Sequence, residues 1–66
     1  MPRYAIDQHV ASWNSGLVYI VKAIHPLDLT GECFAYDVRR LRGGVEYGPT
    51  RHIAESGLVP LDPLAL

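Results

Sequence analysis

The chain has 66 residues, 48% of them hydrophobic, and a formal net charge of −1 at pH 7. This length accommodates one small domain, since so short a chain buries only about 60% of its unfolded surface. The composition disfavours a disordered chain and a dedicated nucleic-acid-binding protein. The single cysteine, Cys33, excludes an intramolecular disulfide and favours a cytoplasmic location. The longest apolar run, residues 17–21, is too short for a membrane span, and the first residues lack the pattern of a signal peptide.

The pattern of apolar and β-branched residues predicts an all-β fold of four to five antiparallel strands in one domain, residues 1–66. Prolines and glycines interrupt every window that is long enough for a helix. The core is expected to cover about residues 8–61, between a short lead-in and a tail. The predicted strands are, in chain order, residues 8–13, 17–24, 33–42, 45–53 and 58–61.

The segments between the strands are rich in turn-forming residues. Residues 14–16, Asn-Ser-Gly, predict a turn, and residues 25–32 predict a loop. We expect Leu27 and Leu29 in this loop to fold back onto the core. Residues 54–57 are typical of a single helical turn before the last strand.

Residues 34–53 give the strongest signal, that of a β-hairpin, because Gly43 and Gly44 supply the positive φ angles of a two-residue turn. Pro49 has no N–H to donate, so its strand should be an edge strand or be broken there. In the predicted register Arg39 lies on the opposite face from Arg40, and His52 lies opposite Ala35. The predicted pairs are Arg42 with Val45, Arg40 with Tyr47, Val38 with Pro49, Tyr36 with Arg51, and Phe34 with Ile53.

Three segments together resemble an SH3-like small barrel, the group that includes Tudor-type and KOW-type modules. They are the strand at residues 17–23, the strand at residues 36–41 with its Gly-Gly turn, and residues 53–61. The last segment is similar to the one-turn 3₁₀ helix and final strand that close such barrels. The resemblance implies this fold and binding through loops and one barrel face. It implies no specific ligand, because the Trp doublet of peptide-binding SH3 domains is absent and no methyl-lysine cage can be traced.

The residues that carry chemistry form no recognisable catalytic or metal pattern. His9, His25, His52 and Cys33 are the soft metal ligands of the chain, and their spacing matches no zinc motif. We therefore expect no metal site, no cofactor and no catalytic residue, with the histidines exposed or locally hydrogen-bonded. Cys33 is expected to be a small buried or half-buried residue, although the predicted register brings it near His52.

The function predicted from these observations is non-catalytic protein binding or self-association, with a possible homodimer. Trp, Tyr and Arg side chains near turns are enriched at binding hot spots. The alternative is a nucleic-acid-binding barrel in which the hairpin arginines contact phosphates and Tyr47 stacks on a base. A third, weaker alternative is a subunit of an oligomeric enzyme. The candidate binding residues are Trp13, Arg39, Arg40, Arg42, Tyr47 and Arg51.

Overall fold

The computed structural model describes residues 2–61, and the expected tail, residues 62–66, lies outside them. The predicted all-β fold of antiparallel strands is confirmed, as is the short 3₁₀ turn before the last strand. In the described part of the chain no helix is long and apolar enough to cross a membrane. The elements are β1 (His9–Ser12), β2 (Val18–Pro26), β3 (Phe34–Arg42), β4 (Val45–Ala54), the 3₁₀ turn η1 (Glu55–Gly57) and β5 (Leu58–Pro60).

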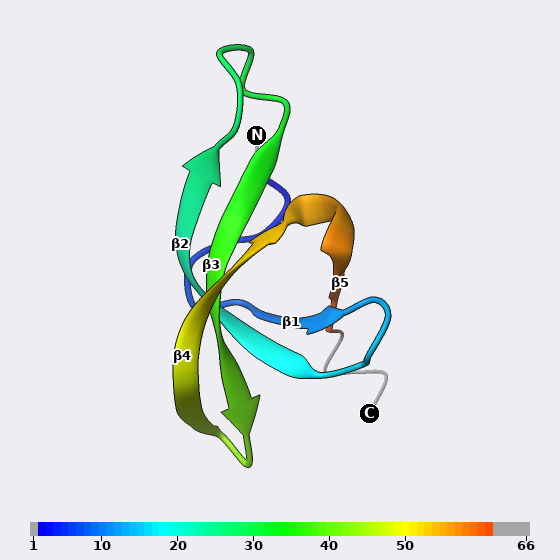
Figure 1. Ribbon diagram of the computed structural model, residues 1–66, viewed down its shortest axis with the longest axis vertical. Coiled ribbons are helices and arrows are strands. Elements are labelled where there is room, and N and C mark those ends of the chain that lie inside the picture. Colours follow the sequence, from blue (N-terminus) through cyan, green and yellow to red (C-terminus); the bar gives the residue numbers. More distant parts are fainter. Residues whose placement is uncertain (1, 62–66) are drawn as a thin grey trace.

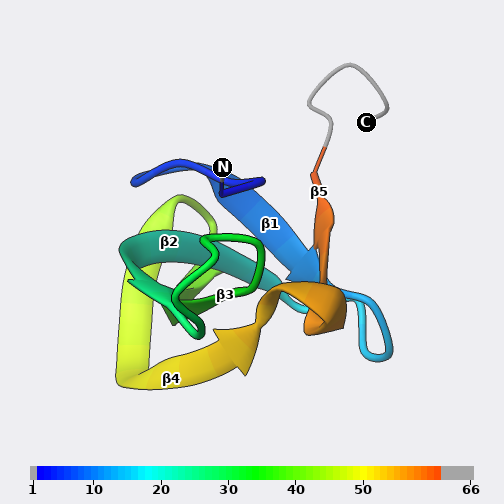
Figure 2. The same ribbon diagram turned by 90° about the horizontal axis from the view of Figure 1, so that it is seen from above.

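The strands form one sheet in the order β4-β3-β2-β1-β5, and every pair is antiparallel. β2 bends along its length: its first part runs beside β1, and its last part rises beside β3 (Figure 1). The bend coincides with a register shift between Val21 and Ala23. Because a bulge increases the local twist of a strand, it lets one sheet wrap around its own core (Figure 2).

The core lies on the inner face of this curved sheet. Tyr36 is fully buried, and its ring meets that of Tyr4 edge to face, with the ring centroids 5.4 Å apart. Tyr4 precedes every strand, so the core extends beyond the expected residues 8–61 and the expectation of a mere lead-in is wrong for this residue. The buried cluster consists of Tyr4, Val10, Tyr19, Val21, Tyr36, Val38 and Leu58.

Two leucines of the β2–β3 loop stay outside this core. Leu27 is 56% exposed and Leu29 is fully exposed, so the expectation that they fold back is wrong. The strand before them extends to Pro26, and a hydrogen bond from the Leu27 N–H to the Cys33 carbonyl continues the β2–β3 ladder. The pairing therefore carries the loop away from the core before its leucines are reached.

The β3–β4 hairpin follows the predicted register only next to its turn. Arg42 lies opposite Val45 and Arg40 opposite Tyr47, as predicted. Beyond this point the pairs are shifted by two residues, so that Val38 faces Arg51 and Tyr36 faces Ile53. The predicted partners Pro49, Arg51 and Ile53 for Val38, Tyr36 and Phe34 are therefore wrong.

The cause of this shift is a bulge in β4 beside Pro49. Gly48 has a φ of +79°, a conformation that other residues adopt only at a cost. Pro49 cannot donate a ladder hydrogen bond, and β4 is an edge strand, as the sequence predicted. Since the shift is by an even number of residues, each side chain keeps its face and only its opposite neighbour changes.

Candidate functional site

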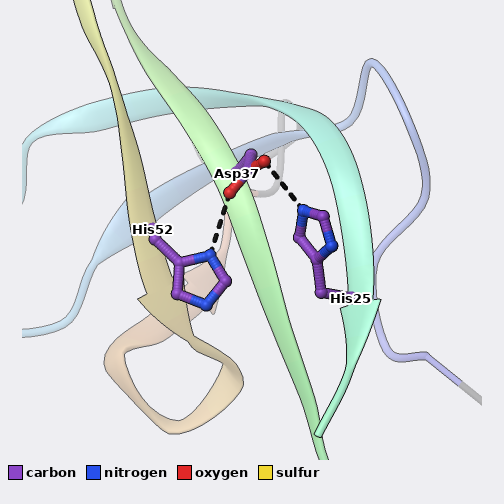
Figure 3. Close-up of side chains that lie close together, drawn as sticks. All are labelled: His25, Asp37 and His52. Carbon is purple, nitrogen blue, oxygen red and sulfur yellow. Dashed lines mark hydrogen bonds and ion pairs between the residues drawn. The ribbon is translucent and has the colours of Figure 1, made fainter.

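Two histidines and an aspartate meet on the outer face of the sheet. Asp37 lies on the central strand β3, His25 on β2 and His52 on β4, and the three side chains point toward one another (Figure 3). We call this group the imidazole–carboxylate cluster. Its donor atoms, one from each residue, all lie within 4.8 Å of one another.

Two hydrogen bonds end on the single carboxylate of this cluster. His25 Nε2 lies 2.8 Å from Asp37 Oδ2, and His52 Nδ1 lies 2.9 Å from Asp37 Oδ1 (Figure 3). The imidazole rings lie side by side, with centroids 5.4 Å apart. The hydrogen bond from His52 lowers the pKa of Asp37 below its ordinary value, and the hydrogen bond from His25 adds a smaller effect in the same direction. The carboxylate is therefore ionised at neutral pH and fixes the position of both rings.

The strand register explains why these three residues meet. His52 is directly opposite Asp37, whereas the sequence predicted that it lies opposite Ala35, so that prediction is wrong. The two-residue shift at the β4 bulge moves His52 along β3 to Asp37. His25 is opposite Ala35 and thus reaches Asp37 diagonally. No spacing in the sequence marks the cluster, because its members come from three strands and both ladders between these strands are irregular.

A second group lies on the inner face, at the free end of the β3–β4 hairpin. We call it the hairpin-tip face, and it consists of Arg40, Arg42, Val45 and Tyr47. The predicted neighbours Arg40 and Tyr47 form a cation–π contact, with Arg40 Cζ 5.2 Å from the centre of the Tyr47 ring. Val45 is 64% and Tyr47 37% exposed. This face thus combines exposed apolar surface with two positive charges.

The four hairpin arginines do not form one patch. Arg39 points to the outer face, where its Nη1 lies 3.6 Å from Glu46 Oε1 and its Nε donates to the Gly48 carbonyl. Glu46 also contacts Lys22, at 3.2 Å. Arg51 is exposed on β4, opposite Val38. Among the described residues Arg40 and Arg42 form no ion pair.

Trp13 lies on the turn between β1 and β2. This turn is away from the free end of the β3–β4 hairpin in both views (Figures 1 and 2). Its side chain is 67% exposed, and its backbone N–H donates to the Gly57 carbonyl. Trp13 and the hairpin-tip face therefore belong to two separate surfaces. Tyr4, near the start of the chain, belongs to neither surface, because it is a buried core residue.

Cys33 is exposed, so the expectation that it is buried or half-buried is wrong. It lines a surface hollow of about 370 Å³ together with Glu32 and Glu55. The hydrogen bond to Asp28 and its charge raise the pKa of the thiol, and the two glutamates act in the same direction. The hollow therefore disfavours the thiolate that a nucleophilic cysteine requires.

No protein-family model matches the chain, and no curated protein or solved structure has significant similarity to it.

Proposed function

We propose that the protein is a small non-catalytic interaction module whose hairpin-tip face binds an acidic, partly apolar segment of another protein. In this proposal the fold is an SH3-like barrel that acts in the cytoplasm, where an exposed free thiol such as Cys33 stays reduced. The observation that carries the proposal is the state of Arg40. Within residues 2–61, Arg40 is stacked on Tyr47, it forms no ion pair, and its buried Nε has no hydrogen-bond partner.

The composition of the face supports an acidic partner. Arg40 and Arg42 provide two positive charges, and the nearby acid, Glu46, lies on the outer face with Lys22. A guanidinium held against an aromatic ring is already ordered, so a carboxylate can bind it at a small entropic cost. Val45 and Tyr47 add apolar area beside the charges.

The experiment is selection of random peptides on the immobilised protein, followed by fluorescence anisotropy of the selected peptides. We expect acidic peptides with an apolar residue to be enriched. Arg40→Gln and Tyr47→Ala should each weaken their binding at least about tenfold, as expected for hot-spot residues. Arg39→Gln is the matched control, because it removes the same charge from the adjacent residue on the opposite face. Peptides whose affinity is unchanged in Arg40→Gln and Tyr47→Ala would place the contact elsewhere and refute this assignment.

The second candidate is binding of nucleic acid by the same face. It is favoured by Arg40 and Arg42, which form no ion pair with any described residue. The exposed ring of Tyr47 also favours it, because it offers a stacking surface for a base. Labelled single- and double-stranded DNA and RNA, titrated at low ionic strength, test it. Binding that falls steeply with added salt and is lost in Arg42→Gln would support this candidate over a peptide. No binding at low salt would remove it.

The interaction partner can also be a second copy of the chain, and we propose that Trp13 forms the contact in that case. An exposed indole on a small domain can bury its area against a second copy of the chain. Sedimentation velocity over a range of concentrations should then show a dimer that Trp13→Ala abolishes. A protein that remains monomeric at all concentrations leaves the hairpin-tip face as the proposed contact surface.

A further inference from the structure

We propose that the imidazole–carboxylate cluster is a binding site for a divalent transition-metal ion, with Zn²⁺ as the probe. His25, Asp37 and His52 would each supply one ligand atom. The proposal is independent of the peptide contact, because the cluster lies on the outer face and the hairpin-tip face on the inner one.

The donor set suits such an ion. Imidazole nitrogen is a preferred ligand of Zn²⁺, Cu²⁺, Ni²⁺ and Co²⁺, and one carboxylate completes a common three-ligand site. Hard cations such as Mg²⁺ bind through oxygen atoms and would find a single carboxylate here. Three protein ligands leave a coordination position open, and both histidines are exposed, so water or a ligand atom of another molecule can fill it.

The geometry is close to that of a bound ion. Ligand bonds of about 2.0–2.2 Å place neighbouring donors roughly 3.4 Å apart on a tetrahedral ion. Here the carboxylate oxygens lie 2.8 and 2.9 Å from the two imidazole nitrogens. All three donor atoms lie within 4.8 Å of one another, so movements of about one ångström would bring them to the spacing of a bound ion. Two exposed imidazole rings can make such movements by small χ rotations.

The three ligands lie in two adjacent rows of paired residues that run across β2, β3 and β4. One row, across β2, β3 and β4, is Ala23, Asp37 and His52. The next row on the same face is His25, Ala35 and Ala54. The three positions of these two rows that hold no ligand are all alanines. The methyl groups form a floor that does not compete for the ion, while paired strands fix the three ligand-bearing backbones.

The test uses the full chain without an affinity tag, in a Cys33→Ser background that removes the exposed thiol as a competing ligand. ZnCl₂ is titrated by calorimetry, CoCl₂ by visible absorption, and MgCl₂ serves as the hard-cation comparison. We expect one Zn²⁺ per chain, a Co²⁺ absorption band, a melting temperature raised by several degrees, and no response to Mg²⁺. His25→Gln, Asp37→Asn and His52→Gln should each weaken binding at least about tenfold. His9→Gln, which removes an exposed histidine of β1, should leave it unchanged.

Circular dichroism of each variant verifies that it is folded, and imidazole NMR signals of the unsubstituted chain give a readout that needs no variant. The proposal predicts that Zn²⁺ shifts the ring signals of His25 and His52 and leaves those of His9 in place. Absence of binding, or binding that survives all three ligand substitutions, would overturn it. The cluster would then be a set of cross-strand hydrogen bonds only.

Discussion

At the scale of single residues, Tyr36 joins three parts of the chain through one hydroxyl group. The backbone N–H groups of Arg3 and Tyr4 donate to its Oη, at 3.0 and 3.3 Å. The same hydroxyl donates to Glu55 Oε2, at 2.6 Å. The ring itself is fully buried between these partners. Tyr36 therefore fastens the N-terminal segment and η1 onto the central strand.

Tyr36→Phe should lower the free energy of unfolding by about 1–3 kcal/mol, because it leaves the Tyr4 N–H without a buried partner. The Arg3 N–H and the Glu55 carboxylate then keep only their 3.2 Å hydrogen bond to each other. The loss is large for this chain, since a domain of this size is stabilised by only about 3–10 kcal/mol. Urea unfolding followed by tryptophan fluorescence measures the difference. Tyr47→Phe, which alters a tyrosine that is partly exposed at the hairpin tip, is the control and should change the stability by less than about 0.5 kcal/mol. Equal stability of Tyr36→Phe and the parent would contradict this role.

The sequence was informative about residues close to the tight turn and uninformative about those that depend on distant contacts. Arg40 could be paired with Tyr47 because a two-residue turn fixes the register of the nearest pairs. Tyr4 could not be assigned to the core, because it lies in no strand and its burial depends on Tyr36 and Leu58. Cys33 was misjudged for the same reason: its exposure follows from the path of the loop and not from its type.

At the scale of elements, the bulge in β4 decides which side chains meet on the outer face. A regular hairpin would put Thr50 opposite Asp37 and His52 opposite Ala35. The two-residue shift at Gly48 puts His52 opposite Asp37 and so completes the imidazole–carboxylate cluster. The strands and the 3₁₀ turn could be predicted from the local sequence pattern, but the cluster could not. A register shift of two residues leaves the alternation of inward and outward side chains unchanged, so the sequence pattern does not reveal it.

Gly48→Ala tests the bulge. The added Cβ would meet no atom within 4 Å, so its cost is that of the positive φ alone, about 1–2 kcal/mol. Gly48→Asn should cost less, because asparagine tolerates this backbone conformation better than alanine. Thermal unfolding of the two variants gives the comparison. If alanine were as stable as glycine at this position, the left-handed conformation of residue 48 would be refuted.

At the scale of the whole molecule, two buried tyrosines make the stability of the fold depend on pH. Burial raises the pKa of Tyr4, and burial together with the hydrogen bond to Glu55 raises that of Tyr36. The folded state thus holds both phenolic protons more tightly than the unfolded chain does. Their contribution to stability is complete below the unfolded pKa, about 10, and is lost as pH rises through the folded values.

We therefore expect the urea midpoint to fall above about pH 10. Tyr36→Phe should show a shallower fall than the parent, because one of the two linked protons is gone. The test is the urea midpoint of the parent and of Tyr36→Phe, measured from neutral to alkaline pH. An unchanged slope of midpoint against pH in Tyr36→Phe would refute the coupling between this tyrosine and stability.

The contacts of Tyr4 have a consequence for how the chain folds. Its hydroxyl donates to the carbonyl of Leu58, 54 positions later, and its backbone N–H is bound by Tyr36, 32 positions later. Contacts of such long sequence separation require large loops to close before they yield any stabilisation, so they slow folding. Tyr4 is synthesised before the other residues of the buried cluster, but its hydroxyl has no partner until Leu58 of the last strand has been made. The folding of this domain is thus expected to be completed only after its last strand has been synthesised.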